Sequence, residues 1–394
     1  MNYHLLLKFG DKVAPLTPTN FKELTIVQDM NRFLPEFRLR VVDASGALTH
    51  ILPFDKGMSR VYIEIASTSD GEYKNSFDFA VFDRKPMGDQ SNPSTMYDIT
   101  GLLDIPGMFS PDYCRAHSSS IKSTLEGIAT DELGVDSSEI SNSLSYTKTL
   151  LQPKWSDIQF LKWAKENLIG SEDEYAYKCF VKCESMKKVF VFKSTPELIS
   201  QPIKHKFIVS PEGQDDNLPI FNYSIYDYYK LHEVFASKKQ NYSYFDYDTS
   251  QFVSGEEDVQ DYLSLSDYWL IDRGDDENSN TLLDLGRSNE FTSDFKGRVK
   301  SSYSNRLMNL VKMWITTVGI SNAVPGSVVQ VLFPHGFSNG ELYSFQYSGY
   351  WLVERVTHNI GDVFMTKLLL TRNGLDTDKI TSLLKSEKTR TSNV

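Results

Sequence analysis

Alternating hydrophobic and polar residues mark both ends of this chain as β-structure. The clearest run lies near the C-terminus, where every second residue belongs to one series: Phe364, Thr366, Leu368 and Leu370. This spacing is the two-residue period of a strand. Residues 359–362, Asn-Ile-Gly-Asp, predict a turn just before it. The last part of the chain, up to Arg372, is therefore expected to form the wall of a barrel.

The first hundred residues carry the same period. Three hydrophobic series predict strands: Phe37, Leu39 and Val41, then Val61, Ile63 and Ile65, then Phe77, Phe79 and Val81. Residues 43–46 and 69–71 supply turns between them. Strands at this spacing favour a small barrel or sandwich.

A helical period replaces the strand period in the middle of the chain. The first predicted helix stops near Gly134 and has this hydrophobic stripe: Ile121, Leu125 and Ile128. The second begins at the N-cap Ser156, with Gln159 completing a capping box, and ends at Gly170. Its stripe is Ile158, Leu161, Ala164 and Leu168. Two strands follow, joined around residues 184–186: residues 175–182 and 187–193.

These changes of pattern divide the chain into five parts. Residues 229–305 are acidic and aromatic and predict an insertion of loops and short strands. The expected parts are residues 1–105, a first β region; 106–204, a connecting α/β unit; 205–228 with 306–374, a second β region; 229–305, the insertion; and 375–394, a flexible C-terminal tail.

Acidic residues outnumber basic ones. The 394 residues include 52 Asp and Glu against 41 Lys and Arg, a formal net charge of −11. Binding to a phosphate backbone relies on clustered Lys and Arg, so this balance disfavours specific nucleic-acid binding. No apolar run approaches the ~20 residues that span a bilayer. The N-terminus also lacks the pattern of a signal peptide, so neither membrane contact nor export is expected.

Cysteines are few, and their number is odd. The three thiols, Cys114, Cys179 and Cys183, form no disulfide framework and fit assembly in a reducing cytoplasm. A zinc site at Cys179 and Cys183 would need further ligands, for which Cys114 and His205 are the candidates in sequence. Free thiols are the favoured interpretation, so we predict no metal and no cofactor.

No catalytic motif emerges from the remaining polar residues. The seven histidines are scattered without a metal-binding pair, and a nucleophile elbow is absent. Asp246 and Asp248 would share one side of an extended strand, as a pair of glycosidase acids would, but a solvated rim is favoured. We therefore predict no catalytic residue.

Three passages in a fixed order resemble one family. They are residues 37–65 with an Asp-x-x-Gly turn; 155–164, Trp-Ser-Asp-Ile-Gln-Phe-Leu-Lys-Trp-Ala, followed by strands 175–192; and 325–329 with 348–358, closed by strand 366–370. In these passages the chain resembles the baseplate hub proteins of tailed bacteriophages, a family that includes the hub portion of type VI secretion spike proteins. Residues 229–305 depart from the family pattern.

The resemblance implies a mainly β, α+β fold in which a small α/β unit joins two antiparallel β-barrels like those of tail tube proteins. It implies a non-enzymatic homotrimer that forms a pseudo-six-fold ring between the hexameric tail tube and the trimeric central spike. Further implied partners are the tape-measure protein and the baseplate wedge proteins. The implied location is the virion, after assembly in the host cytoplasm.

Genomic DNA would pass through the lumen of such a ring without specific binding, and the acidic balance suits this role. We expect that neutralising acidic residues of the lumen slows DNA ejection; an unchanged ejection rate in a phage that carries such variants would contradict the hypothesis.

The strand residues offer candidates for subunit contacts: Phe37, Arg38 and Arg40 in the first β region, and Tyr350, Trp351, Arg355 and His358 in the closing strand. The alternative function is a carbohydrate-active or carbohydrate-binding β-sandwich, such as a tail-associated hydrolase, in which Tyr and Trp stack on sugars and paired acids cleave them. A spike component of a secretion system would share the hub architecture.

Overall fold

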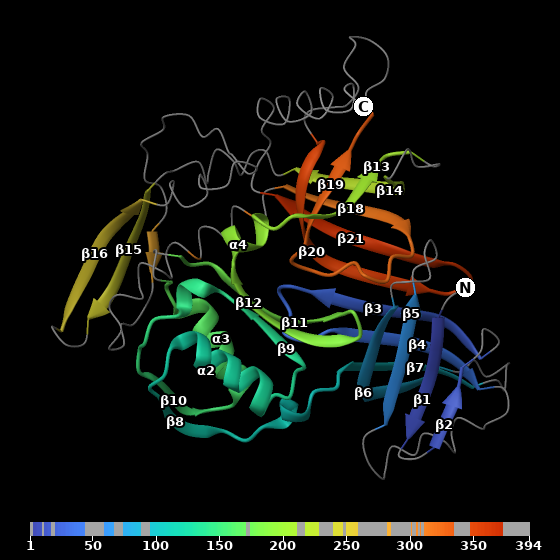
Figure 1. Cartoon of the computed structure of the whole chain (residues 1–394), viewed down its shortest axis with the longest axis horizontal. Helices are drawn as coiled ribbons and strands as arrows, with labels where there is room; N and C mark the ends of the chain where they lie inside the picture. Colours follow the sequence, from blue (N-terminus) through green and yellow to red (C-terminus); the bar gives the residue numbers. More distant parts are fainter. Residues whose placement is uncertain are drawn as a thin grey trace.

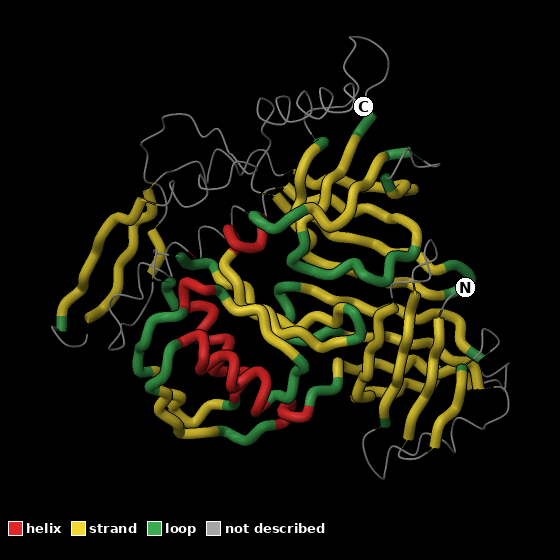
Figure 2. The backbone as a smooth tube through the Cα atoms, in the orientation of Figure 1, coloured by secondary structure: helices red, strands yellow, loops and turns green. Residues whose placement is uncertain are grey.

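The fold is mainly β, with its few helices gathered in one unit (Figures 1 and 2). The computed structural model describes residues 3–9, 12–16, 20–43, 59–66, 74–87, 95–170, 174–210, 217–227, 239–246, 250–258, 282–284, 301, 305, 308, 311–334 and 347–372. The expected mainly β, α+β class is confirmed. The predicted C-terminal tail and the turn residues 44–46 and 69–71 lie outside the described residues.

The N-terminal sheet contains the strands that the alternation predicts. Its strands are β1 (Tyr3–Phe9), β2 (Lys12–Pro15), β3 (Phe21–Asp29), β4 (Glu36–Asp43), β5 (Arg60–Ala66), β6 (Lys74–Met87) and β7 (Thr95–Leu103). They lie in the order β3-β4-β7-β6-β5-β1-β2. The predicted hydrophobic series point into its core, where Leu39, Ile63 and Phe79 are fully buried.

The C-terminal barrel closes on itself. Its strands are β13 (Ile203–Ile208), β14 (Leu218–Asp227), β18 (Val311–Val318), β19 (Val328–Leu332), β20 (Gly349–Ile360) and β21 (Phe364–Arg372). The order β19-β13-β14-β18-β21-β20 ends with a β19–β20 pairing, which completes a ring of six strands. Of the two predicted barrels this one closes; among the described strands of the N-terminal sheet, no pairing joins β1 or β2 to β3.

An α/β unit connects these two β-structures. It contains η1 (Pro106–Phe109), β8 (Tyr113–His117), α2 (Ile121–Gly127), η2 (Ile128–Glu132), β9 (Ser137–Ile140), η3 (Asn142–Leu144), β10 (Leu150–Trp155), α3 (Asp157–Asn167), β11 (Tyr177–Glu184), β12 (Lys187–Ser194) and α4 (Thr195–Ile199). The predicted capping box of α3 is present, since Gln159 N donates to Ser156 Oγ at 3.3 Å and Ser156 N donates to Gln159 Oε1 at 3.0 Å. Ser185 and Met186 turn the β11–β12 hairpin with positive φ.

A small separate sheet lies within residues 229–305. It consists of β15 (Lys239–Asp246), β16 (Gln251–Asp258) and β17 (Leu282–Asp284), in the order β16-β15-β17. Short strands were expected here, and Figure 1 draws this sheet at the left, beyond the α/β unit. The domain boundaries themselves stay predictions.

The N-terminal sheet and the barrel repeat one topology. In chain order, β3, β4, β5, β6 and β7 correspond to β14, β18, β19, β20 and β21. The neighbour order β3-β4-β7-β6-β5 equals the order β14-β18-β21-β20-β19, and every one of these pairings is antiparallel. The chain therefore contains one strand arrangement twice.

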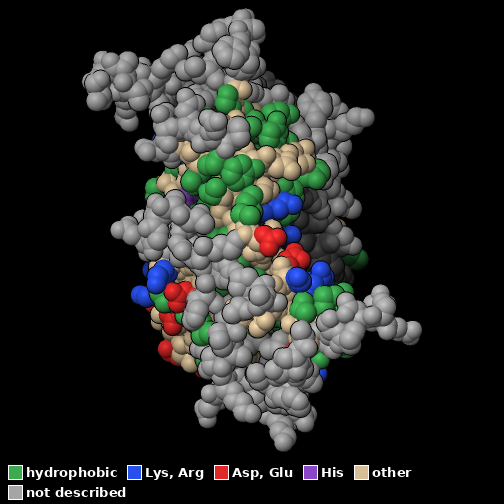
Figure 3. Space-filling view, turned by 90° about the vertical axis from the view of Figure 1, so that its right-hand side faces the viewer, with side chains coloured by type: hydrophobic (Ala, Val, Ile, Leu, Met, Phe, Trp, Pro, Cys, Tyr) green, Lys and Arg blue, Asp and Glu red, His purple; other side chains and the backbone are tan. Residues whose placement is uncertain are grey.

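The two copies join edge to edge. Strand β20 also pairs with β3, so the barrel and the N-terminal sheet form a single sheet of thirteen strands. Figure 3 views the molecule from the right-hand side of Figure 1: hydrophobic side chains gather over its upper part, and charged side chains of both signs lie below them. No helix in the described part of the chain is both long and apolar enough to cross a bilayer.

Candidate functional site

Strand β20 forms the junction between the C-terminal barrel and the N-terminal sheet. Its first half pairs with β19, from Gly349↔Val331 to Leu352↔Val328, and closes the barrel. Its second half pairs with β3, from Arg355↔Asp29 to Ile360↔Leu24. Between the halves, at Glu354, the register with β21 shifts by one residue. Such a bulge bends a strand, so one strand can serve two sheets.

Charged side chains gather around this bulge. The Glu354 carboxylate is almost fully buried and lies 2.8 Å from Lys312 Nζ. Arg355, on the same strand, lies 2.7 Å from the buried Asp29 carboxylate on β3. Removing one partner of either pair would leave a buried charge without compensation. The Arg355–Asp29 pair therefore holds the two β-structures in one arrangement, whereas the Glu354–Lys312 pair stabilises the bulge within the barrel.

A buried lysine of the α/β unit, Lys178, is linked by hydrogen bonds to Glu354. Lys178 Nζ, on β11, donates to Asn305 Oδ1 at 2.8 Å and to Asn31 Oδ1 at 3.4 Å. Asn31 Nδ2 in turn donates to Glu354 Oε1 at 3.0 Å. Burial lowers the pKa of Lys178 to about 8, because its charged form loses water.

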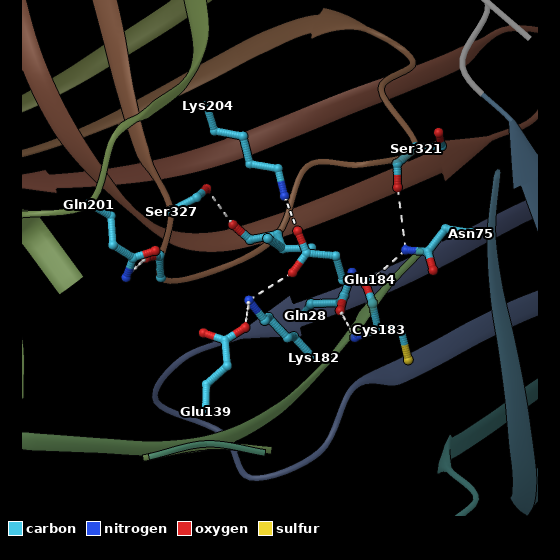
Figure 4. Close-up of polar contacts among 12 residues, drawn as sticks. Gln28, Asn75, Glu139, Lys182, Cys183, Glu184, Gln201, Lys204, Ser321 and Ser327 are labelled. Carbon is cyan, nitrogen blue, oxygen red and sulfur yellow. Dashed lines mark hydrogen bonds and ion pairs between the residues drawn. The ribbon is translucent and has the colours of Figure 1, made fainter. Parts of the chain in front are cut away.

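Uncharged groups make a second connection, which Figure 4 shows. Asn75 Nδ2, on β6, donates to the carbonyl oxygens of Cys183 at 2.8 Å and Ser321 at 3.3 Å. Gln28 Oε1, on β3, accepts from the amide of Cys183 at 2.8 Å. All four residues are at most 1% exposed. The network therefore joins the N-terminal sheet, the α/β unit and the barrel at one buried point.

An ion-pair chain flanks this network (Figure 4). Lys182 Nζ lies 2.8 Å from both Glu139 and Glu184, and Glu184 also pairs with Lys204 on β13. Burial alone would raise the pKa values of both glutamates. The charge and hydrogen bonds of Lys182, with those of Lys193 at Glu139 and Lys204 at Glu184, outweigh burial, and the pKa of each glutamate is lowered. This chain links the α/β unit to the barrel.

Three of the predicted interface residues lie in the protein's own core. Phe37 and Trp351 are buried, and the Trp351 indole N–H donates to Tyr347 O at 3.1 Å. His358 is fully buried between Phe77 and Phe364, and its Nδ1 lies 3.3 Å from Thr366 Oγ1.

The other four interface candidates keep exposed surface. Arg38 and Arg40 both bind the Asp98 carboxylate, Arg355 binds Asp29 across the junction, and Tyr350 is half-buried. The structure brings Arg355 and His358 to one strand half and leaves the arginines of β4 farther along the sheet. A subunit contact at these residues stays a prediction, for which the exposed members are available.

The predicted thiols are separate from one another. Cys179 and Cys183 are buried on β11, where burial raises the pKa of each thiol to about 12, whereas Cys114 is exposed on β8. Among the described residues, no group of three or more His, Cys, Asp or Glu side chains is placed to hold a metal. Asp246 ends β15, and Asp248 lies outside the described residues.

Sequence reasoning missed the residues that form the junction. Asp29, Gln28 and Asn75 were not singled out, although a polar residue inside an otherwise apolar strand face is a usable signal. Their partners lie far away in the chain, so their pairing could not be read from local pattern.

Comparisons with known proteins agree on the fold. No protein-family model and no curated protein matches the chain. It is similar to the 43 kDa tail protein of prophage MuSo2 from Shewanella oneidensis, with 10% identity and a TM-score of 0.60 over 95% of this chain and 100% of that one. The tail protein from Neisseria meningitidis MC58 gives 10% identity and a TM-score of 0.55 over 96% and 99%.

A chain of the half-lidded PdpA-VgrG complex from Francisella is also similar, with 10% identity and a TM-score of 0.52 over 94% of this chain and 58% of that one. The chain thus has the fold of phage tail proteins. The resemblance to tail hub proteins is confirmed at the level of the fold.

Removing the Asn75 side chain should destabilise the whole molecule. We expect N75A to lower the free energy of unfolding by ~1–3 kcal/mol, because two buried carbonyl groups lose their donor. N75D keeps the volume but loses the donor, so it should cost at least as much. The exposed N142A is the control and should stay within about 0.5 kcal/mol. Denaturant unfolding measures these changes, and an N75A value as small as the control's would contradict the role of Asn75.

Stability should fall in acid because of His358. Burial lowers its pKa from 6.5 to about 3. Between these two pH values the unfolded chain binds a proton at His358 that the folded chain does not bind. The stability present above pH 6.5 is therefore lost as the pH falls towards 3, by up to about 1.4 kcal/mol per pH unit.

The variant H358Q should flatten this pH dependence of the unfolding free energy. Burial also lowers the pKa of His205, to about 4, so H205Q should flatten it separately and the double variant further. An unchanged slope in H358Q would exclude the buried neutral state of His358.

Proposed function

We propose that the chain is a structural hub of a phage tail baseplate. Three copies form a ring between the hexameric tail tube and the trimeric central spike, and DNA passes through its lumen. The tape-measure and baseplate wedge proteins are further partners, and the working location is the virion. The role is architectural, without catalysis.

The duplicated strand arrangement carries this proposal. Each chain holds two topologically equivalent β-structures, so a ring of three chains presents six of them. Such a ring meets a six-fold tube on one side while keeping true three-fold symmetry towards the spike. The full-length likeness to two phage tail proteins supports the same assignment.

The joined sheet suits an architectural role. The Asp29–Arg355 pair and the hydrogen bond from Asn31 to Glu354, together with the Asn75 network, fix the angle between the two β-structures. A ring needs this angle to be constant, because an error in it would be repeated at every subunit.

The full-length chain should assemble without hydrolysing glycans. We expect light scattering after size exclusion to show a trimer, or a complex once tail tube or central spike protein is added, and we expect no reducing sugars from peptidoglycan. A stable monomer that binds neither protein and releases sugars would favour the carbohydrate-active alternative. Neighbouring genes would separate a phage hub from a secretion-system spike component.

A further inference from the structure

The turn between β3 and β4 is held against two other parts of the molecule. The amide of Met30 donates to the carbonyl oxygen of Glu354 on β20 at 3.0 Å, and the carbonyl oxygen of Phe33 accepts from the amide of Val181 on β11 at 2.8 Å. Figure 1 accordingly shows β11 running beside β3. Asn31 lies between these two backbone contacts, so its side chain has a defined place between β11 and β20.

The lysine that faces this side chain has unusual partners. Lys178 is only 8% exposed, and both acceptors of its Nζ are amide oxygens: Asn305 Oδ1 at 2.8 Å and Asn31 Oδ1 at 3.4 Å. A buried ammonium group is usually paired with a carboxylate, because a neutral acceptor replaces only part of its lost hydration. This environment therefore suits the neutral amine, and a desolvated neutral lysine is a nucleophile.

Charged groups from four elements surround Lys178. Burial is the largest cause that lowers its pKa to about 8, and the positive charge of Lys165 on α3 is the next. Glu354 on β20 and Asp29 on β3 oppose the shift, whereas Lys312 on β18 adds to it. At pH 8 about half of the Lys178 side chains are therefore neutral amines.

A carboxylate lies on the other side of the same amide. Asn31 Nδ2 donates to Glu354 Oε1 at 3.0 Å, and Lys312 Nζ holds both Glu354 oxygens, at 3.0 and 2.8 Å. The amine thus contacts the carbonyl end of the Asn31 amide, and the carboxylate contacts its nitrogen. The carbonyl carbon lies one bond, about 1.2 Å, from Oδ1, so a small rotation of the Asn31 side chain brings it to Nζ.

We propose that Lys178 and Asn31 become joined by an intramolecular isopeptide bond. Lys178 Nζ attacks the side-chain carbonyl carbon of Asn31 and forms a new C–N bond. Glu354 takes a proton from the attacking nitrogen and gives a proton to Nδ2. The bond from the carbonyl carbon to Nδ2 then breaks, and one ammonia molecule leaves. The amine, the amide and the carboxylate supply every atom, and no further reactant is needed.

Glu354 is the reason for choosing Asn31 over the nearer amide of Asn305. Loss of ammonia requires an acid at the leaving nitrogen, and the structure places a carboxylate at the nitrogen of Asn31. Asn305 instead orients the lysine amine through its Oδ1. Asn31 is exposed at the turn, so the released ammonia escapes directly into water.

The bond would join the α/β unit covalently to the N-terminal sheet. Lys178 and Asn31 are 147 positions apart, so the cross-link closes a long loop. A cross-link of this kind limits the unfolded chain in the way that a disulfide does, but it needs no oxidising compartment. It would also keep the turn against β11 when the hydrogen bonds around it open.

Mass spectrometry of the purified full-length chain tests the bond. After incubation at about pH 9, above the pKa of Lys178, the intact mass should be lower than the sequence mass by one ammonia molecule. Trypsin does not cut after an acylated lysine, so the digest should contain residues 23–32 joined to residues 166–182. An unchanged mass with these peptides separate overturns the proposal.

Two other results of the digest would also overturn it. Loss of ammonia without the branched peptide indicates a succinimide at Asn31. A branch to residues 301–306, which contain Asn305, places the bond at the other amide.

Matched variants assign the roles in the reaction. K178R keeps the positive charge but has no nucleophilic amine, so it should keep the full sequence mass, whereas a succinimide would still form in it. E354Q keeps the acceptor for Asn31 but cannot transfer the proton, and it should slow the loss of ammonia by about a hundredfold or more. K165R removes a neighbouring amine and should react like the wild type. Melting temperatures show whether each variant is folded, and an E354Q that is folded and reacts at the wild-type rate contradicts the role of Glu354.

Discussion

The structure depends on one constraint: a single strand, β20, must close the barrel and join the N-terminal sheet at the same time. The barrel needs its first half to close against β19, and the N-terminal sheet needs its second half as a neighbour for β3. The bulge at Glu354 makes both possible, because it bends the strand and turns a charged residue inwards. That buried carboxylate then requires Lys312 and Asn31, which brings polar groups into the junction and fixes its geometry.

The same constraint explains where polar groups are buried. Apolar side chains fill the interiors of the two β-structures, as the core residues Phe79 and Trp351 illustrate. At their meeting point, by contrast, the hydrogen bonds that Asn75 donates and Gln28 accepts dominate, together with the ion pairs of Lys182. Hydrophobic packing tolerates sliding, whereas directional hydrogen bonds and ion pairs between buried groups allow one arrangement. The molecule thus combines apolar cores for stability with a polar junction for a defined angle.

The features that could be predicted from the sequence are those that neighbouring residues determine. The strand alternation at residues 364–370, the capping box at Ser156 and the turn at residues 184–186 all depend on neighbours in the chain, and all are confirmed. The pairing of β20 with β3 depends on residues more than three hundred positions apart, for example Arg355 and Asp29, and no local period reveals it. The family resemblance implied two similar barrels, but the sequence shows no repeat by simple register, because the strand order is repeated while the side chains differ. His358 and Trp351 appeared as surface candidates because alternation alone does not tell the inner face of a wall from the outer.

The distance in sequence between β3 and its partner has a consequence for synthesis. Thr25 and Asn359, which share a hydrogen bond, are separated by 334 positions. During translation the edge of β3 leaves the ribosome long before its neighbour exists, and closing so large a loop slows folding. This edge of β3 therefore stays open to pairing with a wrong strand until the final strands emerge.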